Sequence, residues 1–349
     1  MNKMSRIVPV MAVLAAILWS TASRAEDNSC VLALYSEGSS STRLLCISAG
    51  GIREIGQLRY QAWYGSDEDS AAFVQVDGQK GSGIRALVVD LKTMSVVMDK
   101  TFGDLHAWPK KSELVENLAV RSKDSTFYFL STVPTNTFGY AEVNWKTGEA
   151  HPVPSSPADE GIYASLVVTP PGFASVMRGR DIVLYGANSR QQLSGIGRAS
   201  RQVYHVPTIG LMELIDGTNR QITDSNLAPI SGNTLQFAGS AVRTTIFVRS
   251  NGGKPLLIWG ENTGPDDPAA RSGTINKIVI FDPIAKMTIL EKQLATAFAD
   301  FRPNADGSKI YLVETASRKI FSFDRKMESL TVFSQFPEQN GPFVIVAAN

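Results

Sequence analysis

Seven segments of this chain share one form: a strand-like run that ends in a polar residue, a short polar turn, and a second strand-like run. In the clearest copies the first run ends in an aspartate, namely Asp90 in 86–101, Asp282 in 278–293 and Asp324 in 320–335. Residues 140–154 repeat the form with Asn144 in the aspartate position, and looser copies cover 45–58, 182–196 and 211–224. Equivalent positions recur 42 residues apart, from Ser48 to Asp90, from Asn144 to Gly186 and from Asp282 to Asp324. Short strands and turns that recur at about 40–45 residues are typical of β-propeller blades.

The repeat predicts an all-β fold, a single seven-bladed β-propeller over residues 26–349, because seven copies give about 46 residues each. Unbroken apolar runs such as Ile278–Phe281 indicate strands that are covered on both faces, as in a blade packed between two neighbours. Residues 343–347 form an apolar strand without a local partner. We expect this strand to join the blade of the first strand, 31–35, and so to close the ring. Residues 112–119 are the one short candidate for a helix.

Residues 1–25 have the features of a secretory signal peptide. Lys3 and Arg6 precede an apolar run of 13 residues, 7–19, and small residues lead to a cleavage position after Ala25. The run is short for a membrane-spanning helix, and we expect no membrane segment after cleavage; the alternative is an uncleaved N-terminal anchor. Loss of this segment would change the net charge from +1 to −2. A nearly neutral chain does not indicate a nucleic-acid-binding protein. The sequence therefore predicts a periplasmic or secreted protein.

The two cysteines, Cys30 and Cys46, flank a predicted hairpin centred near Gly38, which would place them opposite each other. In an oxidising compartment, facing cysteines indicate a disulfide. A redox pair or metal site is the alternative, but no histidine or further cysteine lies nearby.

The segment Asn304–Tyr311 resembles the turn and strand of YVTN-type bacterial β-propellers, and the strand–turn–strand halves at Asp90, Asp282 and Asp324 add to this resemblance. Size, secretion and the ending 340–344 also resemble the propeller subunits of quinone-cofactor amine dehydrogenases. In that family the quinone belongs to a different, smaller subunit. The resemblance therefore implies a small partner subunit and no cofactor in this chain.

Three arginines occupy comparable positions just before predicted turns: Arg121, Arg243 and Arg302. If they converge on the channel mouth, they would favour a carboxylate, a phosphate or an acidic partner loop. The structural alternative is that each arginine pairs with a nearby acid such as Asp124 or Asp306.

The loop 62–69 joins Trp63 and Tyr64 to three acids, a composition that could bind a cation or an amine. The alternative is a packed aromatic pair followed by a solvated turn. Residues 252–273, largely polar and containing proline, are predicted to form a long loop that covers the channel mouth or contacts a partner. The alternative is a disordered excursion.

No catalytic residue can be assigned from the sequence. The three histidines are not in a metal-ligand spacing, and no phosphate-binding or nucleophile motif is present. Three interpretations stay open: a propeller scaffold, as in an amine dehydrogenase-like complex; a metal-dependent propeller hydrolase or lyase acting on a small molecule; and a stand-alone module that binds an anion or a peptide.

Overall fold

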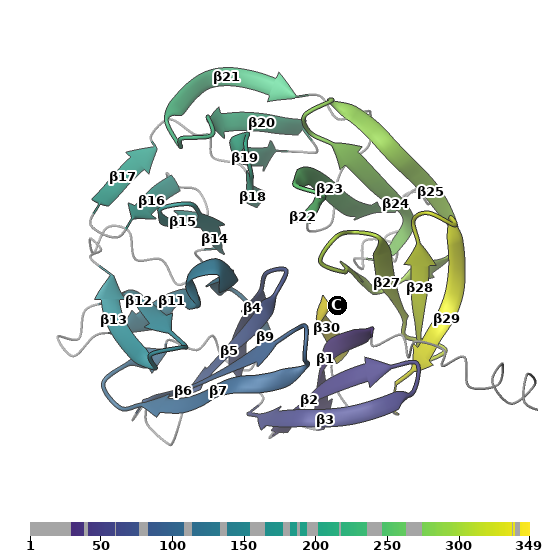
Figure 1. Cartoon of the computed structure of the whole chain (residues 1–349), viewed down its shortest axis with the longest axis horizontal. Coiled ribbons are helices and arrows are strands. Elements are labelled where there is room, and N and C mark those ends of the chain that lie inside the picture. The colour runs from purple at the N-terminus through teal and green to yellow at the C-terminus, as the bar shows by residue number, and fades with distance from the viewer. Residues whose placement is uncertain are drawn as a thin grey trace, which may run out of the picture.

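The computed structural model describes residues 29–37, 41–59, 61–76, 83–107, 114–132, 138–153, 165–176, 182–186, 189–193, 202–215, 218–235, 246–262, 274–336, 338 and 343–349. The predicted signal peptide lies outside the described residues. Seven sheets form a ring, and within each sheet the strands are arranged from the centre outward to the rim (Figure 1). Among the described residues, no helix has the length and apolarity needed to cross a membrane.

We call the sheets blades A to G and give their strands from the centre outward. Blade A contains β30 (Phe343–Ala348), β1 (Cys30–Glu37), β2 (Ser41–Ser48) and β3 (Gly51–Leu58). Blade B contains β4 (Ala62–Ser66), β5 (Ser70–Val76), β6 (Ile84–Asp90) and β7 (Ser95–Phe102), with β9 (Leu114–Glu116) added beside β4. Blade C contains β10 (Ala119–Arg121), β11 (Thr126–Thr132), β12 (Phe138–Asn144) and β13 (Glu149–Val153), with β8 (His106–Ala107) paired to β11 and the 3₁₀ turn η1 (Ser122–Asp124) after β10.

The remaining four blades each have four strands. Blade D contains β14 (Ser165–Thr169), β15 (Gly172–Val176), β16 (Ile182–Gly186) and β17 (Ser189–Leu193). Blade E contains β18 (Gln202–Val206), β19 (Gly210–Ile215), β20 (Thr218–Thr223) and β21 (Pro229–Leu235). Blade F contains β22 (Phe247–Asn251), β23 (Lys254–Glu261), β24 (Ile275–Asp282) and β25 (Met287–Phe298). Blade G contains β26 (Asp300–Pro303), β27 (Lys309–Glu314), β28 (Lys319–Asp324) and β29 (Ser329–Gln335).

The predicted seven-bladed propeller and its closure are confirmed. The C-terminal strand β30 is the innermost strand of blade A and pairs with β1, with Val344 opposite Leu34. The two faces of a central strand pack into different interfaces: in β24, Ile278 and Ile280 face blade G, whereas Val279 and Phe281 face blade E. This two-sided burial explains why the central strands are apolar without alternation.

The aspartate of the repeat closes the turn between the third and fourth strands. In blade F the Asp282 carboxylate accepts backbone N–H groups of Ile284 and Ala285, both at 2.8 Å. Asn144 in blade C accepts those of Lys146 and Thr147 at 3.0 and 3.1 Å. The recurring polar residue is therefore a turn-forming side chain, because short Asx side chains bond their own backbone two or three residues on.

The fourth residue after this Asx adopts the left-handed conformation, with φ of 48° at Met94, 67° at Gly148, 54° at Lys286 and 48° at Glu328. A side chain is strained there, and glycine is not. We expect Lys286→Gly to raise the free energy of unfolding by about 0.5–1 kcal/mol and Gly148→Ala to lower it by about 1 kcal/mol. Urea titration measures both changes. A neutral Gly148→Ala variant would contradict the argument.

One repeat was assigned to the wrong strands. The looser copy at 211–224 places Ile215 in the position that Asp90 and Asp282 hold in the clearest copies, but Ile215 ends β19, the second strand of blade E. The third strand, β20, is followed by Asp224, whose carboxylate accepts the N–H groups of Asn226 and Ala228. Asp224 therefore takes the repeat position in blade E.

Two local predictions are wrong. The candidate helix at 112–119 contains β9, which pairs parallel with β4 because its backbone completes the inner edge of blade B. The predicted long loop begins with a two-residue turn, Gly252 and Gly253, and continues as strand β23, where Trp259 is buried. Residues 263–273 of that loop lie outside the described residues.

The disulfide between Cys30 and Cys46 is confirmed, with 5.7 Å between the Cα atoms. The predicted register is shifted, because Glu37 pairs with Ser41. Consequently Cys30 lies opposite Ser48, and Cys46 lies opposite Leu32. The cysteines are diagonal neighbours on one face of the hairpin, which is close enough for a disulfide.

Candidate functional site

Arg302, on the innermost strand of blade G, contacts three other blades near the ring centre. Its Nε donates to the carbonyl of Ile345 in β30 at 2.8 Å, and its two terminal nitrogens donate to the Glu116 carboxylate at 3.0 and 2.8 Å. The guanidinium also lies 4.7 Å from the ring centre of Phe247 in β22. Although burial disfavours its charge, Glu116 and Asp300 raise the pKa of Arg302 above its ordinary value. One side chain thus joins blade G to blades A, B and F.

Asp300, two residues before Arg302 on β26, also binds the backbone of β30. Its carboxylate accepts the N–H of Ile345 at 3.2 Å and the N–H of Phe301 at 2.8 Å. Burial raises the pKa of Asp300, and the nearby Arg302 opposes this rise. The two side chains therefore bond both backbone polar groups of Ile345, which lies on the channel-facing edge of the closing strand.

Glu116 was not among the sequence candidates, because it lies in the segment expected to be helical. As the last residue of β9 it stands beside Tyr64 of β4, and its side chain is 39% exposed, against 5% for Arg302. Burial raises the pKa of Tyr64, with Glu116 as a further cause. No local pattern marks Glu116, since its partner Arg302 lies 186 residues away in the sequence.

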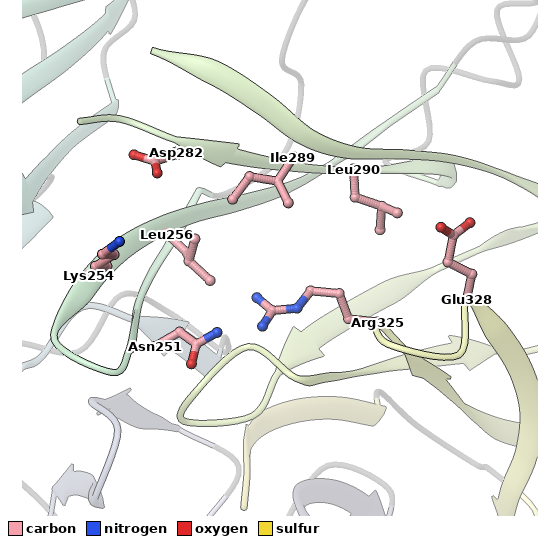
Figure 2. Close-up of a pocket in the computed structure, with 8 residues that line it drawn as sticks. All are labelled: Asn251, Lys254, Leu256, Asp282, Ile289, Leu290, Arg325 and Glu328. Atoms are coloured by element: carbon pink, nitrogen blue, oxygen red, sulfur yellow. The ribbon is translucent and has the colours of Figure 1, made fainter. Parts of the chain in front are cut away.

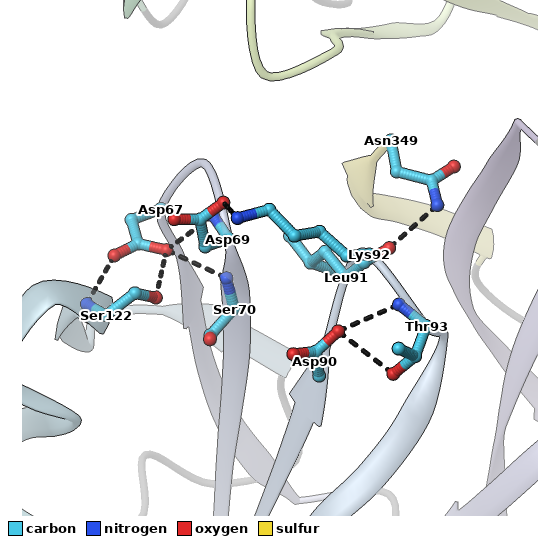
Figure 3. Close-up of polar contacts among 9 residues, drawn as sticks. All are labelled: Asp67, Asp69, Ser70, Asp90, Leu91, Lys92, Thr93, Ser122 and Asn349. Carbon is cyan, nitrogen blue, oxygen red and sulfur yellow. Dashed lines mark hydrogen bonds and ion pairs between the residues drawn. The ribbon is translucent and has the colours of Figure 1, made fainter.

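The turn between β4 and β5 carries the three acids of the predicted loop, and each forms polar contacts; Figure 3 draws two of them, Asp67 and Asp69. Asp67 accepts the N–H groups of Asp69 and Ser70, and it bonds both the N–H and the hydroxyl of Ser122 in blade C. Asp69 pairs with Lys92 at 2.8 Å. These contacts fix the turn to its own blade and to the next one.

Glu68, between them, extends to the other side of the ring. Its carboxylate accepts the backbone N–H of Ser250 in β22, and Arg249 lies close to it. Burial raises the pKa of Glu68, whereas Arg249 opposes the rise. Burial also lowers the pKa of Arg249 to about 10, so this arginine remains cationic at neutral pH. The loop of blade B therefore contacts blade F across the centre, with blades A and G between them in the ring (Figure 1).

The structure separates the two predicted aromatic ligand-binding residues. Tyr64 faces blade A and the Arg302–Glu116 pair, whereas Trp63, on the opposite face of β4, packs in the cluster between blades B and C. Both are buried. Of the two, Tyr64 lies beside the charged groups Arg302, Glu116 and Asp300 at the ring centre.

The predicted arginines are engaged separately. Arg121, at the end of β10, forms an ion pair with Asp124 at 2.6 Å, as in the structural alternative, and its guanidinium lies 5.6 Å from the ring centre of Tyr128. Arg302 pairs with Glu116, not with Asp306. Arg243 lies outside the described residues. A shared anion site formed by the three remains a prediction.

A second charged region is a cleft of about 400 Å³ between blades F and G (Figure 2). Eight residues line it: Asn251, Lys254, Leu256, Asp282, Ile289, Leu290, Arg325 and Glu328. The floor is aliphatic, and the Arg325 guanidinium points into the opening (Figure 2). Across the parts of the chain that are described, no group of three or more His, Cys, Asp or Glu side chains could hold a metal ion.

This architecture defines the chain as a seven-bladed β-propeller. No protein-family model and no curated protein matches the sequence. A solved structure of a provisionally assigned 6-phosphogluconolactonase from Bacteroides uniformis is similar, with a TM-score of 0.51 and 10% identity over 91% of this chain and 96% of that chain.

Two further solved structures are similar at lower scores. AztD from Citrobacter koseri has a TM-score of 0.49 and 8% identity over 92% of this chain and 99% of that one. Dihydro-haem d1 dehydrogenase NirN has a TM-score of 0.49 and 11% identity over 89% of this chain, which spans 64% of the length of NirN. At these identities the similarity supports the fold alone.

Proposed function

We propose that this chain is an exported, non-catalytic propeller that binds a partner protein, and that the reactive cofactor belongs to the partner. The observation that carries the proposal is the mutual engagement of the central charged groups. Arg302 donates hydrogen bonds to Glu116 and to the Ile345 carbonyl, and Asp300 accepts hydrogen bonds from backbone N–H groups. Glu68 accepts the N–H of Ser250 and lies close to Arg249. Such a centre stabilises the ring, because buried charges that are paired with each other have little left to offer a substrate.

The disulfide supports export, since such bonds persist in oxidising compartments. The partner that we propose is a small quinone-bearing subunit, which would make this chain the propeller subunit of an amine dehydrogenase-like complex. The basis is the resemblance of size, secretion and C-terminal sequence, together with the confirmed seven-bladed fold.

The test is purification of the full chain from the cell envelope of its native host under non-denaturing conditions. We expect a stoichiometric smaller subunit whose quinone is detected by redox-cycling stain and by mass spectrometry of the modified residue. The isolated propeller should show no amine-dependent dye reduction, and the complex should show it. A chain that purifies alone, or that turns over an amine without any partner, would contradict the proposal.

A further inference from the structure

The cleft between blades F and G combines an aliphatic floor with two cations that no described residue holds in an ion pair. Among the described residues, no carboxylate lies within 4.0 Å of the Arg325 guanidinium or the Lys254 ammonium. Arg325 is partly buried, and Lys254 is exposed on the neighbouring blade. Arg325 is near enough to help lower the pKa of Asp306, but it forms no ion pair with a described residue within this distance. The cleft therefore has two cations, from two blades, that are not paired with any described acid.

The two acids that line the cleft, Asp282 and Glu328, form polar contacts with groups other than Arg325 and Lys254. Asp282 holds its turn through the N–H groups of Ile284 and Ala285. Glu328 pairs with Lys292 at 3.5 Å, and in Figure 2 its carboxylate points away from Arg325. Neither acid forms an ion pair with Arg325 or Lys254, so these two cations can still bind an incoming carboxylate.

The aliphatic part of the cleft depends on an irregularity of the outer strand. In β25 the register shifts so that Ile280 pairs with Leu290 and Phe281 with Thr288, which leaves Ile289 as the extra residue of a β-bulge. Bulges on edge strands re-aim side chains. Ile289 is 47% exposed and lines the cleft beside Leu290 and Leu256.

Apolar side chains also flank the cleft outside its walls. Ile284 and Met287 are each 56% exposed in the segment from Asp282 to Ile289, and Met327 is 71% exposed between Arg325 and Glu328. A small molecule in the cleft could not cover side chains on both rims. Large exposed apolar side chains close in sequence to cleft-lining residues favour a protein over a small molecule as the ligand.

We propose that this cleft binds an acidic segment of the partner protein, in which a carboxylate stands next to an aliphatic side chain. The carboxylate pairs with Arg325 and Lys254, because a guanidinium binds carboxylates with directed hydrogen bonds. The neighbouring aliphatic side chain packs on Leu256, Ile289 and Leu290, and the flanking segment covers Met287 and Met327. The identity of the partner rests on the proposed function, whereas the chemistry of the segment rests on the cleft.

The first test uses the complete complex. Arg325→Glu with Lys254→Glu should weaken its assembly at least about tenfold, because a favourable charge pair becomes a repulsive one. Lys326→Glu, an exposed neighbour outside the cleft, is the charge control. Ile289→Ser should weaken assembly by several-fold, whereas Val97→Ser should not, since Val97 is the bulge residue of β7 with the same 47% exposure. Assembly that responds equally to the cleft and control variants would overturn the proposal and leave the proposed function intact.

The second test is independent of any partner. The purified full chain is titrated calorimetrically with a capped peptide that alternates glutamate and leucine, and with a matched peptide in which glutamine replaces glutamate. We expect binding of the first peptide alone, weakened by salt and lost in the Arg325→Glu, Lys254→Glu variant. No binding of the acidic peptide, or equal binding of both peptides, would overturn the cleft proposal. Binding of N-acetylleucine as tightly as the peptide would also overturn it, in favour of a small-molecule site.

Discussion

Arg302→Ala should lower the free energy of unfolding by about 3–5 kcal/mol near pH 7. Removal of one partner of a buried ion pair costs this much because the remaining charge stays buried without compensation. Here the loss leaves Asp300 buried without its cationic neighbour, removes the bond to the Ile345 carbonyl and releases Glu116. Urea titration followed by tryptophan fluorescence measures the change.

A matched control is Arg85→Ala on blade B. Arg85 also binds an acid through two hydrogen bonds, to Asp99 at 2.7 and 2.6 Å, but the side chains are 29% and 44% exposed. Exposed ion pairs contribute about 0–1 kcal/mol, so this variant should be nearly neutral. Arg302→Lys, which keeps the charge but loses the two-pronged geometry, should fall between them. Equal effects of Arg302→Ala and Arg85→Ala would show that Arg302 does not stabilise the ring closure.

The stability that Arg302→Ala loses should also depend on pH. Burial raises the pKa of Asp300, and the arginine opposes that rise, so its removal raises this pKa further. A carboxyl whose pKa is higher in the folded state than in the unfolded state binds its proton more tightly when folded. Its ionisation therefore costs stability as the pH rises from its unfolded pKa through its folded pKa. The deficit of Arg302→Ala should accordingly shrink as the pH falls to about 4, near the ordinary aspartate pKa.

The fold could be predicted from the sequence because its signals are local and repeated. The Asx side chains at Asp282 and Asn144 close turns within three residues, and the apolar run in β24 reflects packing on both faces. In blade E the sequence pattern points to Ile215 because the turn signal Asp216–Gly217 follows it, but this signal lies between the second and third strands, whereas the Asx position belongs to Asp224. Local patterns predict the kind of element better than its place in a blade.

The charged cluster around Arg302 at the ring centre could be predicted only in part. Arg302 was singled out because it precedes a turn, but its partners come from β9 and β30, far along the chain. Lys254 and Arg325 have no sequence relation that would bring them together, since two adjacent blades place them at one cleft. Contacts between blades depend on the register of every strand between them, and the repeat does not encode them locally.

Removal of the disulfide is the second large effect that we expect. The bond closes a loop between residues 16 apart, for which chain entropy predicts a contribution of about 3 kcal/mol. Cys30→Ala with Cys46→Ala should lower the free energy of unfolding by up to that amount. Wild-type protein in strong reductant should lose the same amount, whereas the double variant should not respond to reductant.

The position of the bond makes this loss important for the whole ring. Cys30 begins β1, which holds the closing strand β30, and the backbone of Cys30 is bonded to Asn349 at the end of that strand. Opening of the hairpin near Cys30 therefore loosens the junction that Arg302 and Asp300 secure from the channel side. Because the two supports act on the same strand, the double-cysteine and Arg302→Ala losses should not be additive. Strict additivity in the combined variant would show that the disulfide and the arginine stabilise separate parts of the ring.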